Sequence, residues 1–270
     1  MQAIDFQYDN LFLSDFGCII CEFDSGGSPE TISMGSEITF TKTSVSNGRR
    51  FMITDAKYED CIETEFSICK NPDLILEEKD KYFTLEQQRD LIRWLNRTEM
   101  LDFSILDNEH IDIFYEGSFN VDKIELNGRV IGMNLRFQSN RPFGIGKDII
   151  YSFDITLSKT FYIIQDTSDE IGYDYPKVEI TPTANGNLTI TNGFDGRQTI
   201  IKNCVNGEKI TMENLTIEST NQSHNATIMN DFNFKYLRIC NAYNNTRNKY
   251  EFSLPCHVTI TYRPIRKVGI

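Results

Sequence analysis

The sequence predicts a mainly β protein built from two domains. Its 270 residues exceed the roughly 100–150 residues of a typical single domain, so two domains are the default expectation. Only one long stretch, residues 84–99, has the pattern of an amphipathic helix, whereas short alternating runs separated by Asn-Gly turns fill the second half. We therefore expect one helix on a β-sheet in the first half and an antiparallel β-sandwich in the second.

The helix is predicted over TLEQQRDLIRWLNRTE, residues 84–99. Thr84 followed by Gln87 matches a capping box, in which both side chains bond amide groups at the helix start. Helical spacing predicts a core-facing stripe of Leu85, Leu91, Ile92 and Leu95 and a water-facing set of Gln88, Arg89, Arg93 and Arg97. Trp94 lies at the edge of the stripe, where an aromatic residue serves either core packing or an interface.

Short strands are expected around this helix. Ile62, Thr64, Phe66 and Ile68 alternate with Glu63, Glu65, Ser67 and Cys69 and stop at Asn71-Pro72, and Leu101, Phe103 and Ile105 alternate after the helix. Residues 25–29 and 46–50 predict turns, and Asn127-Gly128 is the strongest hairpin signal. The strand after it should place Ile131, Met133, Leu135 and Phe137 on one face, opposite Asn134, Arg136 and Gln138.

The character of the chain changes in the second half. Fourteen of its 23 asparagines lie between residues 185 and 248, so turns dominate there. Residues 147–175 predict one strand or two and a connector. Asn-Gly pairs at 185, 192 and 206 then separate alternating runs that continue to residue 262, including one at Phe232 and Phe234. This spacing is typical of an antiparallel sandwich, and we expect no helix in it.

The seven cysteines predict reduced thiols. Their number is odd, and the N-terminus lacks a positive segment followed by an apolar core, so a disulfide framework is not expected. Cys18 and Cys21 form a CxxC, but no second pair completes a zinc site, and an odd offset in a strand directs the two thiols to opposite faces. Nor does any apolar run approach the roughly 20 residues of a membrane helix. We expect buried, unreactive cysteines, no export and no glycosylation of the six Asn-x-Ser/Thr triplets.

Charge is divided unevenly. Residues 1–150 contain 27 acidic and 15 basic residues, whereas residues 151–270 contain 12 of each, so the first half carries the whole net charge of −12. An acidic domain repels nucleic acid, which excludes an ordinary DNA-binding protein. Solubility alone would also account for this charge.

No motif for catalysis is present. The three histidines, His110, His224 and His257, are far apart and lie in neither an HExxH nor a Gly-x-Ser-x-Gly pattern. Gly146-Lys147 lacks the remainder of a phosphate-binding loop, and Asp15-Phe16-Gly17 lacks the other kinase motifs. We predict no catalytic, cofactor-binding or metal-binding residues and no cofactor.

Several stretches together resemble the distal tail protein family of long-tailed, non-contractile bacteriophages and prophages. They are LSDFGCIICEF, CIETEFSICKNP, TLEQQRDLIRWLNRTEMLDF with Asp107 and Phe114-Tyr115, MNLRFQSNRPFGIG, GNLTITNG, IKNCVNGEKITM and FSLPCHVTITYRP. Each stretch is loose, but their order and spacing cover almost the whole chain.

This resemblance implies a β-sandwich-like belt domain with one α-helix at residues 1–150 and a galectin-like antiparallel β-sandwich at residues 151–270. It further implies a non-enzymatic virion protein, made in the bacterial cytoplasm, that forms a hexameric ring at the tail tip. The implied partners are other copies of the chain, the tail tube protein and the tail-tip hub, fibre or receptor-binding proteins. DNA would pass through the lumen without specific binding, and no membrane is involved.

Two further hypotheses concern particular residues. The alternative function is a carbohydrate-binding module on the second domain, for which Tyr173, Tyr175 and Tyr243 are candidate stacking residues, although ordinary packing also explains them. If residues 1–150 line a DNA channel, acids such as Glu59, Glu63, Glu65, Glu77 and Glu78 would form a repulsive wall. The other interpretation is that these acids keep a sheet edge soluble.

Overall fold

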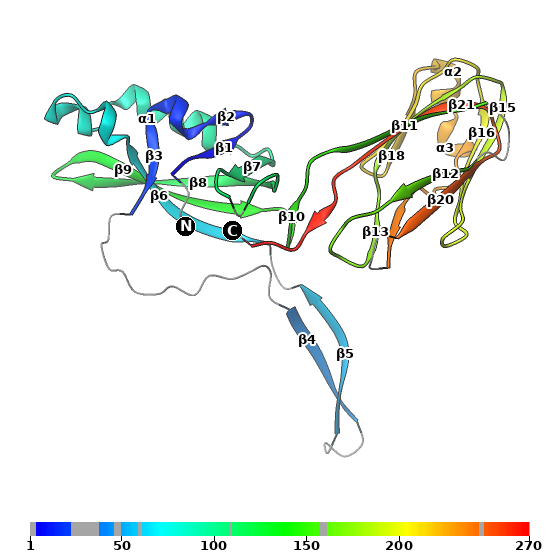
Figure 1. Ribbon diagram of the computed structural model, residues 1–270, viewed down its shortest axis with the longest axis horizontal. Helices are drawn as coiled ribbons and strands as arrows, with labels where there is room; N and C mark the ends of the chain where they lie inside the picture. The colour runs from blue at the N-terminus through cyan, green and yellow to red at the C-terminus, as the bar shows by residue number, and fades with distance from the viewer. Residues whose placement is uncertain are drawn as a thin grey trace. The chain divides into compact units, whose positions relative to one another are not determined.

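The computed structural model describes residues 4–22, 38–45, 50–58, 61–108, 110–156, 161–242 and 246–269. Its contacts divide the chain into unit 1, residues 1–145 with 266–270, and unit 2, residues 146–265. Both units are mainly β (Figure 1). The turns expected at 25–29 and 46–49 lie outside the described residues, as do Tyr243 and Glu59. No helix among the described residues is long and apolar enough to cross a membrane.

Unit 1 contains a seven-stranded sheet in the order β2-β1-β7-β8-β9-β6-β3. Its strands are β1 (Phe6–Tyr8), β2 (Leu11–Phe12), β3 (Cys18–Cys21), β6 (Glu63–Lys70), β7 (Leu101–Ile105), β8 (Tyr115–Leu126) and β9 (Arg129–Ser139). The two edges of the sheet meet, because the Ile20 N–H donates to the Ile4 carbonyl oxygen at 3.0 Å. The sheet therefore curls round an interior instead of remaining open.

Aromatic rings fill this interior. Phe6, Phe66, Phe103, Phe119 and Phe137 are buried, and each has ring contacts with others of the set at centroid distances between 4.6 and 6.2 Å. Tyr8 and Tyr115 are fully buried beside them. Large rings that alternate inward along strands bury much apolar area, so this cluster contributes strongly to the hydrophobic stabilisation of unit 1.

The expected helix is α1 (Leu85–Leu95), and short 3₁₀ turns surround it. The capping box is confirmed: the Gln87 N–H donates to Thr84 Oγ1 at 3.3 Å and the Thr84 N–H to Gln87 Oε1 at 3.0 Å. The helix ends at Leu95, earlier than expected, where Asn96 donates its side-chain N–H to the Phe119 carbonyl at 2.9 Å. The 3₁₀ turns are η1 (Leu13–Phe16), η2 (Pro72–Leu74) and η3 (Glu78–Lys81).

The buried face of α1 differs from the expected stripe. Leu91 and Leu95 are buried, but Leu85 and Ile92 are 72% and 39% exposed, and Gln88 is buried. The reason is Trp94, which is 3% exposed. Successive residues advance by about 100° round a helix, so a face that includes Trp94 is rotated away from Leu85 and Ile92 and takes in Gln88, whose Nε2 donates to the Phe83 carbonyl.

The strands of unit 1 follow the sequence pattern with one shift. Asn127 and Gly128, both with positive φ, form the β8–β9 turn, as expected of a type I′ hairpin. Met133, Leu135 and Phe137 are buried, but Ile131 is not, and Val130 is buried in its place. Ile124 pairs with Gly132 while Glu125 pairs with Val130, so Ile131 is an extra residue at a bulge that reverses the alternation.

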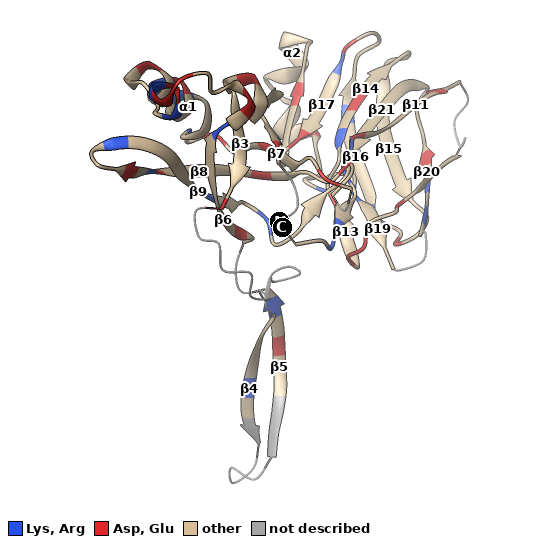
Figure 2. Cartoon of the chain, turned by 60° about the vertical axis from the view of Figure 1, so that its left-hand side comes forward, with Lys and Arg blue, Asp and Glu red and all other residues tan. Residues whose placement is uncertain are grey.

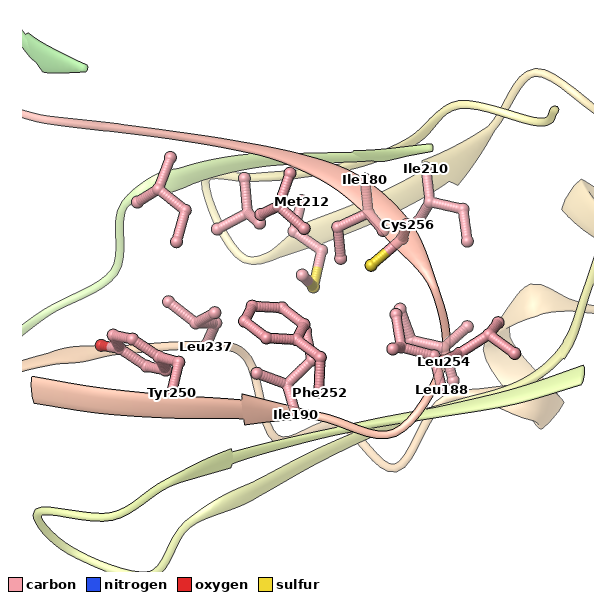
Figure 3. Close-up of a cluster of buried hydrophobic side chains, with 14 of the residues drawn as sticks. Ile180, Leu188, Ile190, Ile210, Met212, Leu237, Tyr250, Phe252, Leu254 and Cys256 are labelled. Carbon is pink, nitrogen blue, oxygen red and sulfur yellow. The ribbon is translucent and has the colours of Figure 1, made fainter. Parts of the chain in front are cut away.

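Unit 2 is an antiparallel sandwich with a five-stranded sheet, β11-β21-β14-β17-β18, and a four-stranded sheet, β12-β20-β15-β16. The bounds are β11 (Ile149–Ile155), β12 (Phe161–Gln165), β14 (Lys177–Pro182), β15 (Gly186–Asn192), β16 (Gln198–Cys204), β17 (Ile210–Glu213), β18 (Thr216–Ser219), β20 (Arg247–Phe252) and β21 (Cys256–Tyr262). Four further strands form short pairs: β13 (Gly172–Asp174) pairs with β19 (Ile239–Asn241) in unit 2, and β10 (Gly144–Ile145), of unit 1, pairs with β22 (Ile265–Arg266). Inward residues such as Ile180, Met212, Leu188 and Phe252 pack between the two sheets (Figure 3).

Two expectations for unit 2 are wrong. Residues 147–175 contain three strands, β11, β12 and β13, and not one or two. Two single-turn helices, α2 (Gln222–Asn225) and α3 (Ile228–Asp231), occur where none was expected, and Phe232 makes only an isolated bridge. Four residues are too few for a helical period to be visible, and α2 depends instead on Asn221, whose side chain accepts from two backbone N–H groups.

The rotated face of α1 gives a direct test. Leu95→Ala should destabilise the protein by about 2–5 kcal/mol, because it leaves a cavity in the aromatic core. Leu85→Ala is the matched control, since Leu85 is 72% exposed, and it should change the free energy of unfolding by less than about 0.5 kcal/mol. Denaturant unfolding monitored by Trp94 fluorescence measures both, and equal losses would contradict this assignment.

Candidate functional site

The sequence candidates for chemistry are not brought together. His110 lies in unit 1, and His224 and His257 lie in different parts of unit 2, where each imidazole contacts a carboxylate. Within the described ranges no group of three or more His, Cys, Asp or Glu side chains has the arrangement of a metal site. The histidines must therefore be considered one at a time.

His257 belongs to a chain of hydrogen bonds that sequence reasoning missed. Its Nδ1 lies 2.7 Å from Asp154 Oδ1, and its Nε2 lies 3.3 Å from Ser152 Oγ. This is the connectivity of a nucleophile, a base and an orienting acid. However, all three side chains stand on the exposed strands β11 and β21, where water screens the charges that catalysis would need to stabilise. We interpret them as a surface network.

His224 and Glu208 form a buried pair. Nδ1 of His224 lies 2.8 Å from Glu208 Oε2, and both side chains are almost fully inaccessible. Glu208 also accepts from the Val205 N–H at 2.7 Å and from Ser219 Oγ at 2.5 Å. These bonds fasten the β16–β17 turn, β18 and α2 to one another, so the role of the pair is structural.

Four of the seven cysteines, Cys18, Cys204, Cys240 and Cys256, are buried as expected, whereas Cys21, Cys61 and Cys69 are only partly buried. Cys18 faces the core and Cys21 the other side of β3, and all seven cysteines are free. Burial raises the pKa of Cys18 to about 12, and that of Cys204 and Cys240 to about 11. At neutral pH these groups are protonated thiols, which are poor nucleophiles and poor metal ligands.

The aromatic candidates for sugar stacking are only partly available. Tyr173 is 58% exposed, but the Arg238 guanidinium lies 4.2 Å above its ring and Tyr175 packs against it edge-on. Arg238 is held by Asp195 at 2.7 Å. Burial alone would raise the pKa of Asp195, but hydrogen bonds from the Arg197 N–H and from Arg238 outweigh it and lower that pKa. One face of Tyr173 is thus occupied, and carbohydrate binding stays a prediction.

The acids expected to form one wall are divided between two surfaces. Glu63 and Glu65 lie on the outer face of β6, where they line an open hollow of about 300 Å³ with Asn120, Arg136 and Gln138. Glu77 and Glu78 lie in the turns before α1. Lys79 Nζ lies 2.7 Å from Glu77 Oε2. Acidic residues are spread over the helix, its preceding turns and the sheet (Figure 2). Only Glu63 and Glu65 share the hollow.

A surface of another kind is the β4 (Ile38–Val45) and β5 (Arg50–Tyr58) hairpin, which forms a two-stranded sheet of its own. The directly paired residues Ile38 with Tyr58, Phe40 with Ala56 and Lys42 with Ile53 share one face, because opposite residues point to the same side. The other face carries Thr39, Thr41 and Asp55. The hairpin is thus apolar on one side and polar on the other.

The apolar face of this hairpin has no cover within the described chain. Ile38, Phe40 and Ile53 are 48%, 50% and 58% exposed. An isolated two-stranded hairpin is only marginally stable in water and normally packs its apolar side against something. Sequence reasoning predicted a turn at residues 46–50 but did not identify the hairpin or its apolar face. We regard the apolar hairpin face, Ile38, Phe40 and Ile53, as the candidate assembly surface.

The base of the hairpin is fixed by the segment 266–269. Lys267 Nζ donates to the Tyr58 hydroxyl at 3.1 Å and lies 5.3 Å from the Phe143 ring, while Phe143 packs edge-on against Tyr58 at 4.6 Å. His110 Nε2 and the Tyr115 hydroxyl contact the Gly269 carbonyl at 3.1 and 2.9 Å. The returning segment therefore orients the start of an otherwise exposed arm.

Fold and surfaces together define a β-rich protein of two units whose described residues form no metal site. Comparison with protein families extends this: residues 1–141 match a phage tail protein N-terminal domain and residues 143–262 a phage tail C-terminal domain. The chain therefore belongs to this family of phage tail proteins, and it is a structural component of the tail and not an enzyme.

Among solved structures, the chain resembles the Dit (gp 19.1) protein of phage SPP1. The match covers 97% of this chain and 99% of that one, with a TM-score of 0.63 and 12% identity. Its title describes SPP1 Dit as a paradigm of the hub adsorption apparatus in phages that infect Gram-positive bacteria. At this identity the match establishes a shared fold, so the expected fold class is confirmed, and the two family matches confirm the expected membership of a phage tail protein family. Comparison with curated proteins yields no significant match.

The buried pair in unit 2 gives a prediction for stability. Glu208→Ala should destabilise the protein by about 3–5 kcal/mol, because it leaves His224 buried without its partner. Glu218→Ala, which removes an exposed carboxylate from the nearby β18, should cost less than about 0.5 kcal/mol. Thermal unfolding of both variants compares them, and similar melting temperatures would show that the pair contributes little.

Proposed function

We propose that six copies of this chain close into a ring that joins the tail tube to the hub, fibre or receptor-binding proteins at the tail tip. The observation that carries this proposal is the match of nearly the whole chain, in both directions, to a protein described as part of a hub adsorption apparatus. The same proposal places the protein at the tip of the tail in the virion.

The hairpin supports ring formation on physical grounds. A closed ring of identical copies needs two different complementary surfaces on each copy, so that every copy binds its neighbour head to tail. An arm with an uncovered apolar face supplies one such surface, because its burial against a neighbour removes Phe40, Ile38 and Ile53 from water. We further propose that the ring-forming domain spans residues 1–150 and that the second domain spans residues 151–270.

The lumen of such a ring would pass DNA without binding it. Unit 1 is acidic, and the hollow on β6 presents Glu63 and Glu65 beside a single cation, Arg136. Carboxylates prevent the multiple phosphate contacts that would retain DNA. At about 0.15 M salt the Debye length is roughly 8 Å, so the repulsion acts mainly when DNA approaches the wall.

Assembly can be measured on the purified protein. We expect a species of about 187 kDa by light scattering, six times the 31.2 kDa of one chain, with six-fold rings in negative-stain images. Phe40→Asp should abolish it, because a charge on the apolar hairpin face cannot be buried without a partner. Thr41→Asp, on the polar face of the same hairpin, is the control and should assemble normally. Monomers at high concentration, alone and with the tail tube protein, would refute the ring.

The charged lumen is tested in assembled phage. Replacement of both Glu63 and Glu65 by Lys should slow DNA ejection, with a larger effect at low salt than at high salt. Glu218 and Glu251, which are exposed on unit 2 and are replaced in the same way, make a control of equal charge change outside unit 1. An ejection rate that does not change in the first variant would exclude these two acids from a repulsive wall.

A further inference from the structure

The segment from η2 to α1 presents a second set of uncovered apolar side chains. Leu74, Leu76, Leu85 and Ile92 are 63%, 90%, 72% and 39% exposed. We call these four residues the α1 patch. They come from a continuous stretch that lies together on one side of the seven-stranded sheet (Figure 1). Leu85 and Ile92 are seven residues apart, two helical turns, and so project from the same side of α1.

The α1 patch is not a by-product of poor folding. Its neighbours in the same helix, Leu91, Trp94 and Leu95, are almost fully buried, so the core is complete without it. Leu76 is nearly as exposed as in an unfolded chain, and the acidic residues Glu77 and Glu78 follow it directly. Clustered exposed leucines with a polar rim are typical of a protein contact surface.

The charge around the α1 patch indicates which kind of surface binds it. Residues 72–93 contain six acidic and four basic residues, and three of the four cations are within 4.0 Å of a carboxylate of the same segment: Lys79, Lys81 and Arg93. An acidic surplus therefore rims the patch. The hairpin sequence, residues 38–58, has the opposite sign, with four basic residues and one acidic residue. Opposite potentials favour one docking partner and steer it to its site.

We propose that the α1 patch is the socket for the β4–β5 hairpin of a second copy of this chain. Apolar side chains Ile38, Phe40 and Ile53 of one copy would cover Leu74, Leu76 and Leu85 of the next, with Lys42 among the acids of the rim. The two surfaces differ and complement each other, as a head-to-tail ring requires. This inference rests on the proposed ring and identifies the two surfaces that close it.

Photocrosslinking tests the contact directly. Phe40 is replaced by p-benzoylphenylalanine, and the variant is mixed with ¹⁵N-labelled copies before irradiation. We expect crosslinks between labelled and unlabelled chains that map to residues 72–92. The same replacement at Thr41, on the polar hairpin face, should give at least about tenfold fewer crosslinks to that segment. Crosslinks confined to the chain's own copy, or to any other segment, would overturn the proposal even where the ring forms.

A mixing experiment tests the head-to-tail arrangement. Phe40→Asp disrupts the apolar hairpin face, and Leu76→Asp disrupts the α1 patch. Each variant alone should remain monomeric, because the substitution weakens assembly about tenfold or more. An equal mixture should give dimers of about 62 kDa, twice the mass of one chain, and no rings. In such a dimer, the intact hairpin of the Leu76→Asp chain binds the intact α1 patch of the Phe40→Asp chain. A further interface would have to combine the altered hairpin with the altered patch, so no third copy is added.

The outcomes separate the two proposals. Leu76 is 90% exposed, so the monomeric Leu76→Asp variant should melt at the same temperature as the monomeric Phe40→Asp variant, and its loss of assembly would not reflect misfolding. If wild type forms rings and Leu76→Asp does so equally, the socket lies elsewhere although the ring stands. If wild type forms no rings but the Phe40 probe still crosslinks to residues 72–92 of other copies, the contact stands without the ring.

Discussion

Trp94 joins the parts of unit 1. Its indole stacks between Phe6, at 5.5 Å with ring planes 4° apart, and Phe16, at 4.5 Å with planes 16° apart. Its Nε1–H donates to the Tyr8 carbonyl at 2.9 Å. Because β1, η1 and α1 all converge on this side chain, it determines which face of the helix is buried. The exposure of Leu85 and Ile92, and hence the α1 patch, follows from that choice.

Most polar groups inside the protein are used for structure. Glu208 and His224 fasten turns in unit 2, His110 and Tyr115 retain the returning segment 266–269, and burial keeps the thiols protonated. The relay of catalytic type found among the described residues, Ser152 with His257 and Asp154, lies in open solvent. The buried polar interactions named above therefore stabilise the fold and do not form a catalytic site. This agrees with a structural role in the phage tail.

Surface features carry the functional information instead. A hairpin that is apolar on one side, a second apolar patch beside an acidic rim and an acidic hollow on β6 all lie in unit 1. Unit 2, with 13 acidic and 11 basic residues, is nearly balanced in charge, and it has a core between its two sheets. Both units expose apolar side chains, since Phe161 and Phe234 of unit 2 are 51% and 58% exposed, but the large acidic surplus lies in unit 1.

The sequence by itself determined the parts that depend on local periodicity and turn chemistry. It predicted the start of α1 from Thr84 and Gln87, the Asn127-Gly128 hairpin, and the opposite placement of Cys18 and Cys21, because each depends on neighbours a few residues away. The order and spacing of many stretches, each of them unspecific by itself, were also enough to predict the family. Tertiary structure alone decided the rotation of α1 towards Trp94, the bulge that exchanges Ile131 for Val130, and the pairing of Glu208 with His224. Those outcomes depend on residues distant in the chain, whose proximity no local pattern encodes. The apolar hairpin face became visible in the same way, since only the register of β4 on β5 places Ile53 on the same side as Phe40.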